Sequence, residues 1–348
     1  MDLFAWTGID LLEVKQMKYR KLTVSLAAMG MLLLILDGKT ALRGANEGVT
    51  VCLQSLIPTL FPFIFLSSIL MFSVDGKGFS FLGGLEKLTG IPKGSGFFLV
   101  LSFSGGYPVG ASNVAQAYRR GQLSREDGAR MLSFCSNCGP SFFFGILGPM
   151  FERRWIPWLL WGIHIVSAIL TGALLPSSPG SFREARENSV PSMSRILENS
   201  LKVMATVCGW VILFRILLAF LVKLCFQYVP EDISLLLTGI LELANGCIGL
   251  VKTQDPGLRF LIASAITAFG GVCVTLQTAS VIAGLPIRNY LAGKLIQCGI
   301  SISLSLPVYT LLSNAKLPIW SWLMILAGTI LVIKYWKNSS SIPSAIGV

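Results

Sequence analysis

The sequence predicts an all-α polytopic membrane protein of transporter-like architecture, with two inverted repeats that contain re-entrant hairpins and broken transmembrane helices. The first observation is composition: 53% of the residues are hydrophobic and 13% are charged, whereas soluble domains carry roughly 25% charged residues. The second is that the charges separate apolar runs of about 16 to 25 residues, the length that spans a bilayer. The third is that glycine and proline interrupt several of these runs near their centres.

The stretch 102–148 contains two such interruptions, at residues 104–108 and 137–140. Glycine loses backbone entropy in a helix interior, and proline lacks the N–H that the helix needs. A helix broken inside a bilayer is tolerated only where its freed backbone groups face protein or a water-lined cavity. Transporters form their binding sites at breaks of this kind. We therefore expect a binding site at mid-depth in the membrane.

The N-terminal part predicts one membrane helix followed by a kinked one. Basic residues at positions 15, 18, 20 and 21 precede the apolar run 22–36, which places the N-terminus in the cytoplasm. Polar residues follow this run at once and offer no signal-peptide cleavage site, so we expect the helix to be retained. A mildly amphipathic stretch, 37–53, leads into the apolar run 54–74, where Pro58 and Pro62 should produce a kink.

Residues 97–118 are expected to form a re-entrant hairpin that turns at 104–108. Lys93 precedes this run and arginines follow it at 119, 120, 125 and 130, so both of its ends are expected in the cytoplasm. A single crossing is the alternative, and it would leave the arginine cluster outside. Residues 131–150 then cross with a break at 137–140, and 155–175 return, with three tryptophans near the start as in an interfacial belt.

The second half repeats this order after a polar stretch, 176–202, that is typical of a cytoplasmic linker. Its apolar runs are 203–222, 233–251 (broken at Asn245 and Gly246), 258–283 (broken at Gly270 and Gly271), 290–312 and 319–336. An odd number of crossings separates the two repeat starts. The second repeat should therefore be inverted relative to the first, and both chain ends should be cytoplasmic.

The net charge of +11 is explained by Lys and Arg residues on the cytoplasmic side of the membrane. Most of the 28 Lys and Arg residues, Lys294 among them, are assigned to the cytoplasmic side, as the positive-inside rule expects. We therefore expect no nucleic-acid partner, although a basic chain can have one. The eight cysteines lie mostly inside apolar runs, which argues against a secreted disulfide framework.

Glu242 is the only acidic residue in the middle of a predicted membrane segment. A carboxylate at that depth is costly, so it is usually functional, as a proton or cation site or as a contact to a substrate hydroxyl. The alternative is that Glu242 pairs with Arg215, which lies in the apolar run 203–222, and holds two helices together. The two roles are compatible, and the sequence leaves both open.

The other candidate substrate-binding residues lie at or near the predicted breaks: Ser104, Gly106, Tyr107, Asn113, Asn137, Asn245 and Gln277. Hydroxyls and amides suit a polar, mostly neutral ligand, and the N-termini of broken helices favour anionic groups. Any single small residue is explained as well by close helix packing, but the clustering of breaks in both halves is not. If the hairpin tips meet, Glu242 and Ser104 should approach one cavity, with Asn137 and Gln277 nearby.

Known catalytic and metal-binding patterns are absent from the sequence. Cys135 and Cys138 form a C-x-x-C pair, a spacing that redox and metal sites use, but no second pair stands at zinc spacing. His164 is the only histidine and lies in a tryptophan-rich apolar run, where a structural role is expected. There is no Walker loop, nucleophile elbow or H-E-x-x-H motif. We therefore expect no enzyme activity, no catalytic residue, no metal site and no cofactor.

Three motifs at the predicted breaks carry a resemblance to a known family. They are GYPVGA at 106–111, followed by Gly121 and by the acidic pair 126–127; SFCSNCGP at 133–140; and LELANG at 241–246. On these residues the chain resembles the bacterial sporulation integral membrane protein family (YlbJ type), which carries nucleoside-recognition (gate) domains. The resemblance covers most of residues 40–312. It implies a fold akin to concentrative nucleoside transporters, with re-entrant hairpins around a central site.

The domains that follow are the cytoplasmic N-terminus with the first transmembrane helix (1–36), the first gate-like repeat (37–175), the cytoplasmic linker (176–202), the second gate-like repeat (203–312), and the last transmembrane helix with the C-terminal tail (313–348). The resemblance implies a multi-pass protein of the cell membrane, either the bacterial inner membrane or a forespore or mother-cell membrane. Its role there would be in sporulation, in forming the spore envelope or cortex.

Two classes of function follow from the residues and the resemblance together. The polar breaks favour a permease that carries a small polar solute through a central site between the two gate-like repeats, with a proton or another cation as a coupling ion. The alternative is a non-transporting structural or assembly membrane protein that keeps the transporter fold. The expected partners are the lipid bilayer, the solute and the coupling ion, and an oligomer is compatible with the sequence.

Overall fold

The computed structural model of the chain describes residues 11–73, 80–177, 180–183, 192–282, 284–313, 328–330 and 334. Within these ranges the regular elements are helices, and the only β-type pairing is an isolated bridge between Lys93 and Ser181. Five helical stretches are long and apolar enough to cross a membrane: Gly38–Leu70, Ile156–Leu174, Met193–Leu224, Pro256–Val281 and Ile287–Ser313. The predicted fold class, an all-α polytopic membrane protein, is confirmed.

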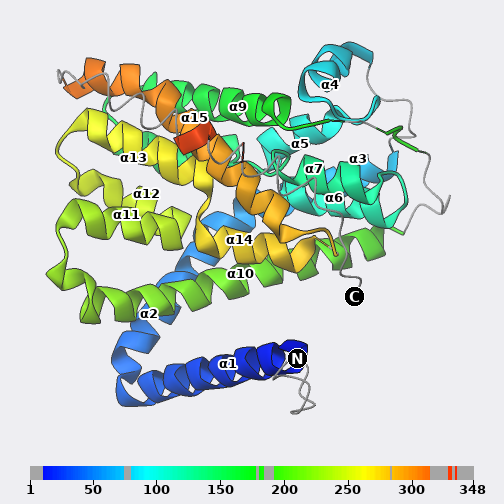
Figure 1. Cartoon of the computed structure of the whole chain (residues 1–348). Helices are drawn as coiled ribbons and strands as arrows, with labels where there is room; N and C mark the ends of the chain where they lie inside the picture. The colour runs from blue at the N-terminus through cyan, green and yellow to red at the C-terminus, as the bar shows by residue number, and fades with distance from the viewer. Residues whose placement is uncertain are drawn as a thin grey trace, which may run out of the picture.

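The first helix stands apart from the helical bundle. α1 (Leu11–Leu36) lies below the bundle in Figure 1, and the side chains of its second half are mostly exposed. Asp37 ends it and begins α2 (Gly38–Val51), because its carboxylate accepts the backbone N–H of Thr40 at 3.2 Å. The same carboxylate forms an ion pair with Lys223 of α10 (Met193–Leu224), with Nζ and Oδ2 2.5 Å apart.

α2 packs closely along α10. A Cβ on Gly44 would lie 2.8 Å from the Ile216 Cα, and one on Gly48 would lie 2.8 Å from the Ile212 Cα. Two glycines four residues apart thus let the two backbones approach, as small residues do between membrane helices. α2 continues through a π-helical turn, Cys52–Leu56, into α3 (Ile57–Ser73). The irregularity expected from the prolines is this turn, which lies just before them, and the helix continues through Pro62.

The first predicted hairpin is a pair of short helices that pack against each other. α4 (Gly83–Thr89) leads to α5 (Phe97–Gly105), and α6 (Val109–Arg119) follows after the break at residues 106–108. Gly106 has a φ of +76°, a conformation that glycine adopts without strain. The turn therefore lies within the predicted segment 104–108, while entry and exit on one side of the membrane stay a prediction.

The next helix is broken over a longer stretch than the sequence predicts. α7 (Arg125–Leu132) ends well before α8 (Pro140–Phe142), which continues through two irregular turns to Met150. Residues 133–139 between them are non-helical, whereas the prediction confined the break to 137–140. α9 (Ile156–Leu174) follows and is long and apolar enough to cross the membrane. Arg130 of α7 donates to carbonyl oxygens at the C-terminal ends of α4 and α9, which ties these three elements together.

The second half contains a hairpin and a broken helix in the same order. α10 is followed by α11 (Glu231–Leu241) and α12 (Leu243–Gly249), and then by α13 (Pro256–Phe269), α14 (Gly271–Val281) and α15 (Ile287–Ser313). The break between α13 and α14 lies at Gly270 and Gly271, as predicted, and both have positive φ. In Figure 1, α11 and α12 lie beside α13, and α10 runs along the lower side of the bundle.

The second hairpin is broken at Glu242, and the prediction of a break at Asn245 and Gly246 is wrong. Glu242 has extended backbone angles, φ −144° and ψ 116°, while Asn245 and Gly246 lie inside α12. A Cβ on Gly246 would lie 2.2 Å from the Gly239 Cα of α11. Gly246 therefore serves to bring the two arms of the hairpin together and not to end a helix.

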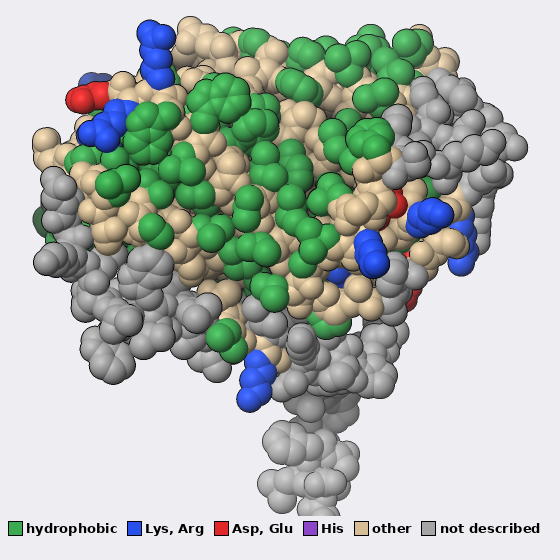
Figure 2. Space-filling view, turned by 90° about the horizontal axis from the view of Figure 1, so that it is seen from above, with side chains coloured by type: hydrophobic (Ala, Val, Ile, Leu, Met, Phe, Trp, Pro, Cys, Tyr) green, Lys and Arg blue, Asp and Glu red, His purple; other side chains and the backbone are tan. Residues whose placement is uncertain are grey.

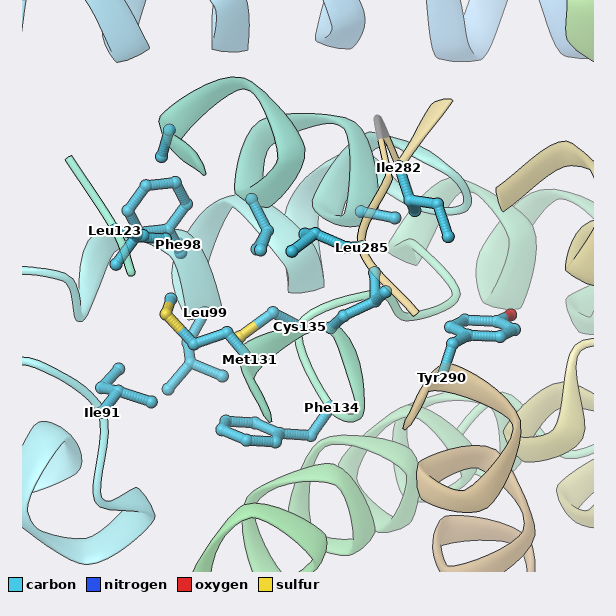
Figure 3. Close-up of a cluster of buried hydrophobic side chains, with 14 of the residues drawn as sticks. Ile91, Phe98, Leu99, Leu123, Met131, Phe134, Cys135, Ile282, Leu285 and Tyr290 are labelled. Carbon is cyan, nitrogen blue, oxygen red and sulfur yellow. The ribbon is translucent and has the colours of Figure 1, made fainter. Parts of the chain in front are cut away.

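Two large apolar cores hold the bundle together. One joins α5, α7, residues 133–135 and the start of α15, and Figure 3 shows Leu99, Met131, Phe134 and Tyr290 of this core. The other lies around α9, α12 and α13. The outer surface also carries many apolar side chains: hydrophobic side chains are distributed across the described face in Figure 2, and Lys and Arg lie mainly toward its edges. The chain is therefore a multi-pass membrane protein in contact with the lipid bilayer.

The relation between the two halves stays a prediction. Each half places a helical hairpin before a broken helix, which is the order the repeat predicts. This order alone does not establish that a two-fold axis in the membrane plane relates the two halves. The predicted last crossing, 319–336, lies almost wholly outside the described residues.

Candidate functional site

A cavity of about 210 Å³ lies where the broken elements of the two halves meet. Its polar or backbone-exposing lining residues are Gln54, Ser55, Thr59, Gly106, Tyr107, Cys138, Gly139, Ser141, Glu242 and Gln277. Apolar side chains of α3, α8, α10, α12 and α14, and of the π-helical turns before α3 and after α8, complete the walls. The lining thus combines the two breaks of the first half with the hairpin break of the second. A mostly apolar pocket with a few convergent polar groups is typical of small-molecule sites.

Glu242 reaches the cavity because its own side chain makes the hairpin break. Its extended backbone ends α11, whose last hydrogen bond runs from the Glu242 N–H to the Thr238 carbonyl oxygen. Its carboxylate then caps α12: Oε1 accepts the Ala244 N–H at 3.0 Å and Oε2 accepts the Asn245 N–H at 2.7 Å. These N–H groups have no partner within the helix, so the carboxylate satisfies them. Each carboxylate oxygen keeps acceptor capacity that a ligand hydroxyl or amine can use.

Arg215 is not the partner of Glu242. Its Nη1 lies 4.0 Å from Oε2 of Glu47 on α2, and Glu242 is in none of the ion pairs found among the described residues. Arg215 lines a second cavity of about 310 Å³ together with Glu47, Thr238 and Asn245. The structure thus places the buried acid and the buried arginine beside different cavities.

Four of the eight predicted site residues line the central cavity: Gly106, Tyr107, Glu242 and Gln277. Tyr107 donates its hydroxyl proton to the Thr267 carbonyl oxygen at 3.2 Å, which fixes its ring at the α13–α14 break. The Gln277 amide lies in contact with Cys273 one turn earlier on α14, with Nε2 and Sγ 3.3 Å apart. Residues from both halves therefore meet here, as the sequence predicts.

The other four predicted residues do not line this cavity. Ser104 donates to the Val100 carbonyl oxygen within its own helix, at 2.9 Å, a local bond that satisfies the hydroxyl. Asn113 is buried, with its Oδ1 3.5 Å from the hydroxyl of Ser67 on α3. Asn245 lines the second cavity with Arg215. Asn137 lies behind the central cavity, in a hydrogen-bond network that the sequence analysis did not predict.

Lys294 of α15 is the centre of that network, and its assignment to the cytoplasmic side is wrong. The side chain is 0% exposed. Its Nζ lies 2.6 Å from Gln297 Oε1, 3.2 Å from Tyr107 Oη and 3.4 Å from Asn137 Oδ1. It also lies 5.0 Å from the centre of the Tyr107 ring, within the range of a cation–π contact.

One signal in the sequence could have identified Lys294. Polar residues recur at positions 294, 297, 301 and 305, which is helical spacing, and all four are buried. A polar stripe inside an apolar helix faces the protein interior because lipid cannot satisfy it. The positive-inside rule counted Lys294 by its position near the start of the helix and ignored this periodicity.

The network extends from Lys294 to the first-half breaks. Gln297 Nε2 donates to Asn137 Oδ1 at 3.1 Å, and Asn137 Nδ2 donates to the Ser102 hydroxyl at 2.6 Å. The Cys138 N–H donates to Nε2 of His164 at 3.0 Å, so the predicted structural histidine holds the break in place. Cys135 and Cys138 are both free and buried. Among the described residues no cluster of three His, Cys, Asp or Glu side chains could hold a metal.

Comparison with known proteins gives one relative. The chain is 25% identical over 301 residues to the sporulation integral membrane protein YlbJ of Bacillus subtilis (strain 168). The alignment covers 72% of this chain and 72% of the relative. No family model and no solved structure matches the chain. The predicted nucleoside-recognition domains therefore stay a prediction. The chain is therefore similar, as a distant relative, to a sporulation integral membrane protein over most of its length.

Proposed function

We propose that the chain is a membrane protein of sporulation that acts as a permease for a small polar solute, which binds in the central cavity. The observation that carries this proposal is that the cavity is lined by backbone breaks of both halves and contains the buried carboxylate of Glu242. Secondary transporters bind their substrates at broken helices that line a cavity between two repeats. The sporulation role comes from the similarity to YlbJ and would concern the spore envelope or cortex, in a forespore or mother-cell membrane.

The lining suggests the chemistry of the solute. Glu242 offers acceptor oxygens, and Gln277, Gln54 and Ser141 offer amide and hydroxyl groups that both donate and accept. Apolar walls would pack against the remainder of the solute. The volume of about 210 Å³ lies below the range of about 300–1,000 Å³ that is usual for drug-sized ligands, so the solute should be small.

Uptake into proteoliposomes that contain the purified full-length chain tests this function. The panel would include nucleosides, dicarboxylates and cortex precursors. The main variant is Gln277→Leu, because Gln277 lines the cavity and caps no helix. Its control is Gln122→Leu, since Gln122 is a buried glutamine that does not line the cavity. We expect saturable uptake of at least one solute, lost in Gln277→Leu and retained in the control.

Complementation separates this function from the structural alternative. A Bacillus subtilis strain that lacks YlbJ would receive the wild-type chain or Gln277→Leu, and heat-resistant spores would be counted. A permease predicts that Gln277→Leu fails although it is present in the membrane at the wild-type level. Full complementation by Gln277→Leu, together with no uptake of any panel solute by the wild type, would favour a structural or assembly protein.

A further inference from the structure

The three hydrogen bonds of Lys294 describe an ammonium group. An ammonium carries three donors, whereas a neutral amine has two donors and one acceptor. The acceptors come from three places in the fold: Gln297 on α15 itself, Tyr107 at the break before α6, and Asn137 at the break before α8. All three protons of the ammonium are therefore used.

Each of these three groups is oriented as an acceptor by its other bonds. Tyr107 gives its own proton to the Thr267 carbonyl oxygen, so its oxygen presents a lone pair to Nζ. The Asn137 amide nitrogen donates to Ser102 and to the Phe134 carbonyl oxygen, which directs Oδ1 toward Lys294. The Gln297 amide nitrogen donates to Asn137 and to the His164 carbonyl oxygen, which likewise directs Oε1 toward Nζ.

The charge of this ammonium has no carboxylate partner among the described residues, because Lys294 is in none of their ion pairs. The titratable groups around it are neutral in their ordinary state at pH 7: Tyr107, Tyr290, Cys135, Cys138 and His164. Cys135 also interacts with Arg130, whose guanidinium is bound by carbonyl oxygens beside α4 and α9. A buried ammonium is costly unless hydrogen bonds compensate it, so the proton depends on the three acceptors.

Two of these acceptors belong to the breaks that form the central cavity. Tyr107 lines the cavity with its own atoms, and Asn137 directly precedes Cys138 and Gly139, which also line it. A movement of either break would therefore withdraw an acceptor from Lys294. The occupant of the cavity and the proton on Lys294 are linked through the same two segments.

We propose that Lys294 is the proton-binding site of the protein, loaded when the breaks lie as they do here and released when they move during transport. On release the Nζ–H bond breaks, the proton passes to a water molecule in the opened cavity to give hydronium, and a neutral amine remains. The reverse step reloads the site. The coupling rests on the proposed permease function, whereas the proton site itself does not.

The proton can be observed directly by solid-state NMR of the full-length chain in lipid bilayers with ¹⁵N-labelled lysine. The Lys294 signal is assigned by its loss in Lys294→Arg, and its ammonium–amine transition is followed from pH 6 to pH 11. Tyr107→Phe removes one acceptor and keeps the ring. The matched control is Tyr290→Phe, because Tyr290 also faces Nζ, at 5.8 Å from the ring centre, but its hydroxyl is not among the acceptors of Lys294.

We expect Lys294 to be charged at pH 6 in the wild type. Tyr107→Phe should bind the proton about tenfold more weakly, which lowers the titration midpoint by about one pH unit, because one hydrogen bond to a charged group is lost. Asn137→Ala should shift the midpoint in the same direction, and Tyr290→Phe should leave it unchanged. A neutral amine at pH 6 in the wild type, or equal midpoints in Tyr107→Phe and the wild type, would overturn the proposal.

The coupling is tested separately by the pH dependence of uptake in proteoliposomes. For a solute that the wild type carries, Tyr107→Phe should move the pH of half-maximal uptake by the same amount as the NMR midpoint. An unchanged pH dependence would remove the coupling and leave the permease function standing. No uptake of any panel solute, with the NMR shift present, would remove the permease function and the coupling and leave the proton site.

Discussion

Replacing Glu242 by glutamine should destabilise the fold through the cap of α12. The carboxylate supplies two oxygens to two backbone N–H groups, at 3.0 and 2.7 Å. Glutamine keeps one oxygen and turns an NH₂ group toward the other N–H, so one buried donor loses its partner. A hydrogen bond to a charged group is worth about 1.5–3 kcal/mol, and relief of the buried charge offsets part of that loss. We expect the free energy of unfolding to fall by about 2 kcal/mol.

Unfolding in mixed detergent–SDS micelles, followed by circular dichroism, measures this loss. The control is Glu231→Gln at the start of α11, because Glu231 forms an exposed ion pair with Lys252 at 3.3 Å, and such pairs contribute about 1 kcal/mol or less. Arg215→Met completes a double-mutant cycle, and we expect its effect to add to that of Glu242→Gln. Wild-type stability of Glu242→Gln would refute the capping role. Strong non-additivity with Arg215→Met would restore the ion-pair interpretation.

Two further predictions concern packing and topology. Gly110→Ala would place a Cβ 1.9 Å from the Cys135 carbonyl oxygen, so thermal unfolding should show a loss of stability of about 1–3 kcal/mol or more. The control, Gly162→Ala in α9, meets nothing within 4 Å and should leave the stability unchanged. Equal stabilities of the two variants would contradict the close approach of α6 to residues 133–139. Lys93→Cys and Arg119→Cys flank the first hairpin at exposed positions, and in a background without native cysteines both should react with an impermeant maleimide from the same face. Labelling from opposite faces would establish a single crossing.

The helix breaks were predictable where glycine or proline interrupts the helix. They were less predictable where a side chain ends one helix by capping the next. The breaks at Gly106 and at Gly270 lie where the sequence placed them, because both positions need a positive φ that few other residues adopt. Gly246 misled the prediction, since glycine is also the residue that lets membrane helices touch. Glu242 breaks its hairpin by capping the next helix, a role for which glutamate is not among the usual residues.

The candidate site was predicted in its second-half acid, whereas its lysine is indicated only by the helical spacing of polar residues in α15 and its bonding partners are not indicated at all. Glu242 stands out because no other acid lies in an apolar run, and a buried carboxylate needs a reason. Lys294 lies near basic residues at a helix start, so a rule based on loops assigns it to water. Its partners Tyr107 and Asn137 are 187 and 157 residues away in the chain. Only the tertiary fold brings them together, and no local pattern encodes that distance.

Thiol labelling at position 277 tests whether the central cavity opens to both sides of the membrane, and it requires no knowledge of the solute. Gln277→Cys would be made in a variant whose native cysteines, including Cys138 in the same cavity, are replaced by alanine or serine. A small impermeant thiol reagent is then applied to oriented proteoliposomes from one face at a time. A permease with its site in this cavity predicts labelling from both faces. Protection from both faces, in a correctly folded protein, would contradict it.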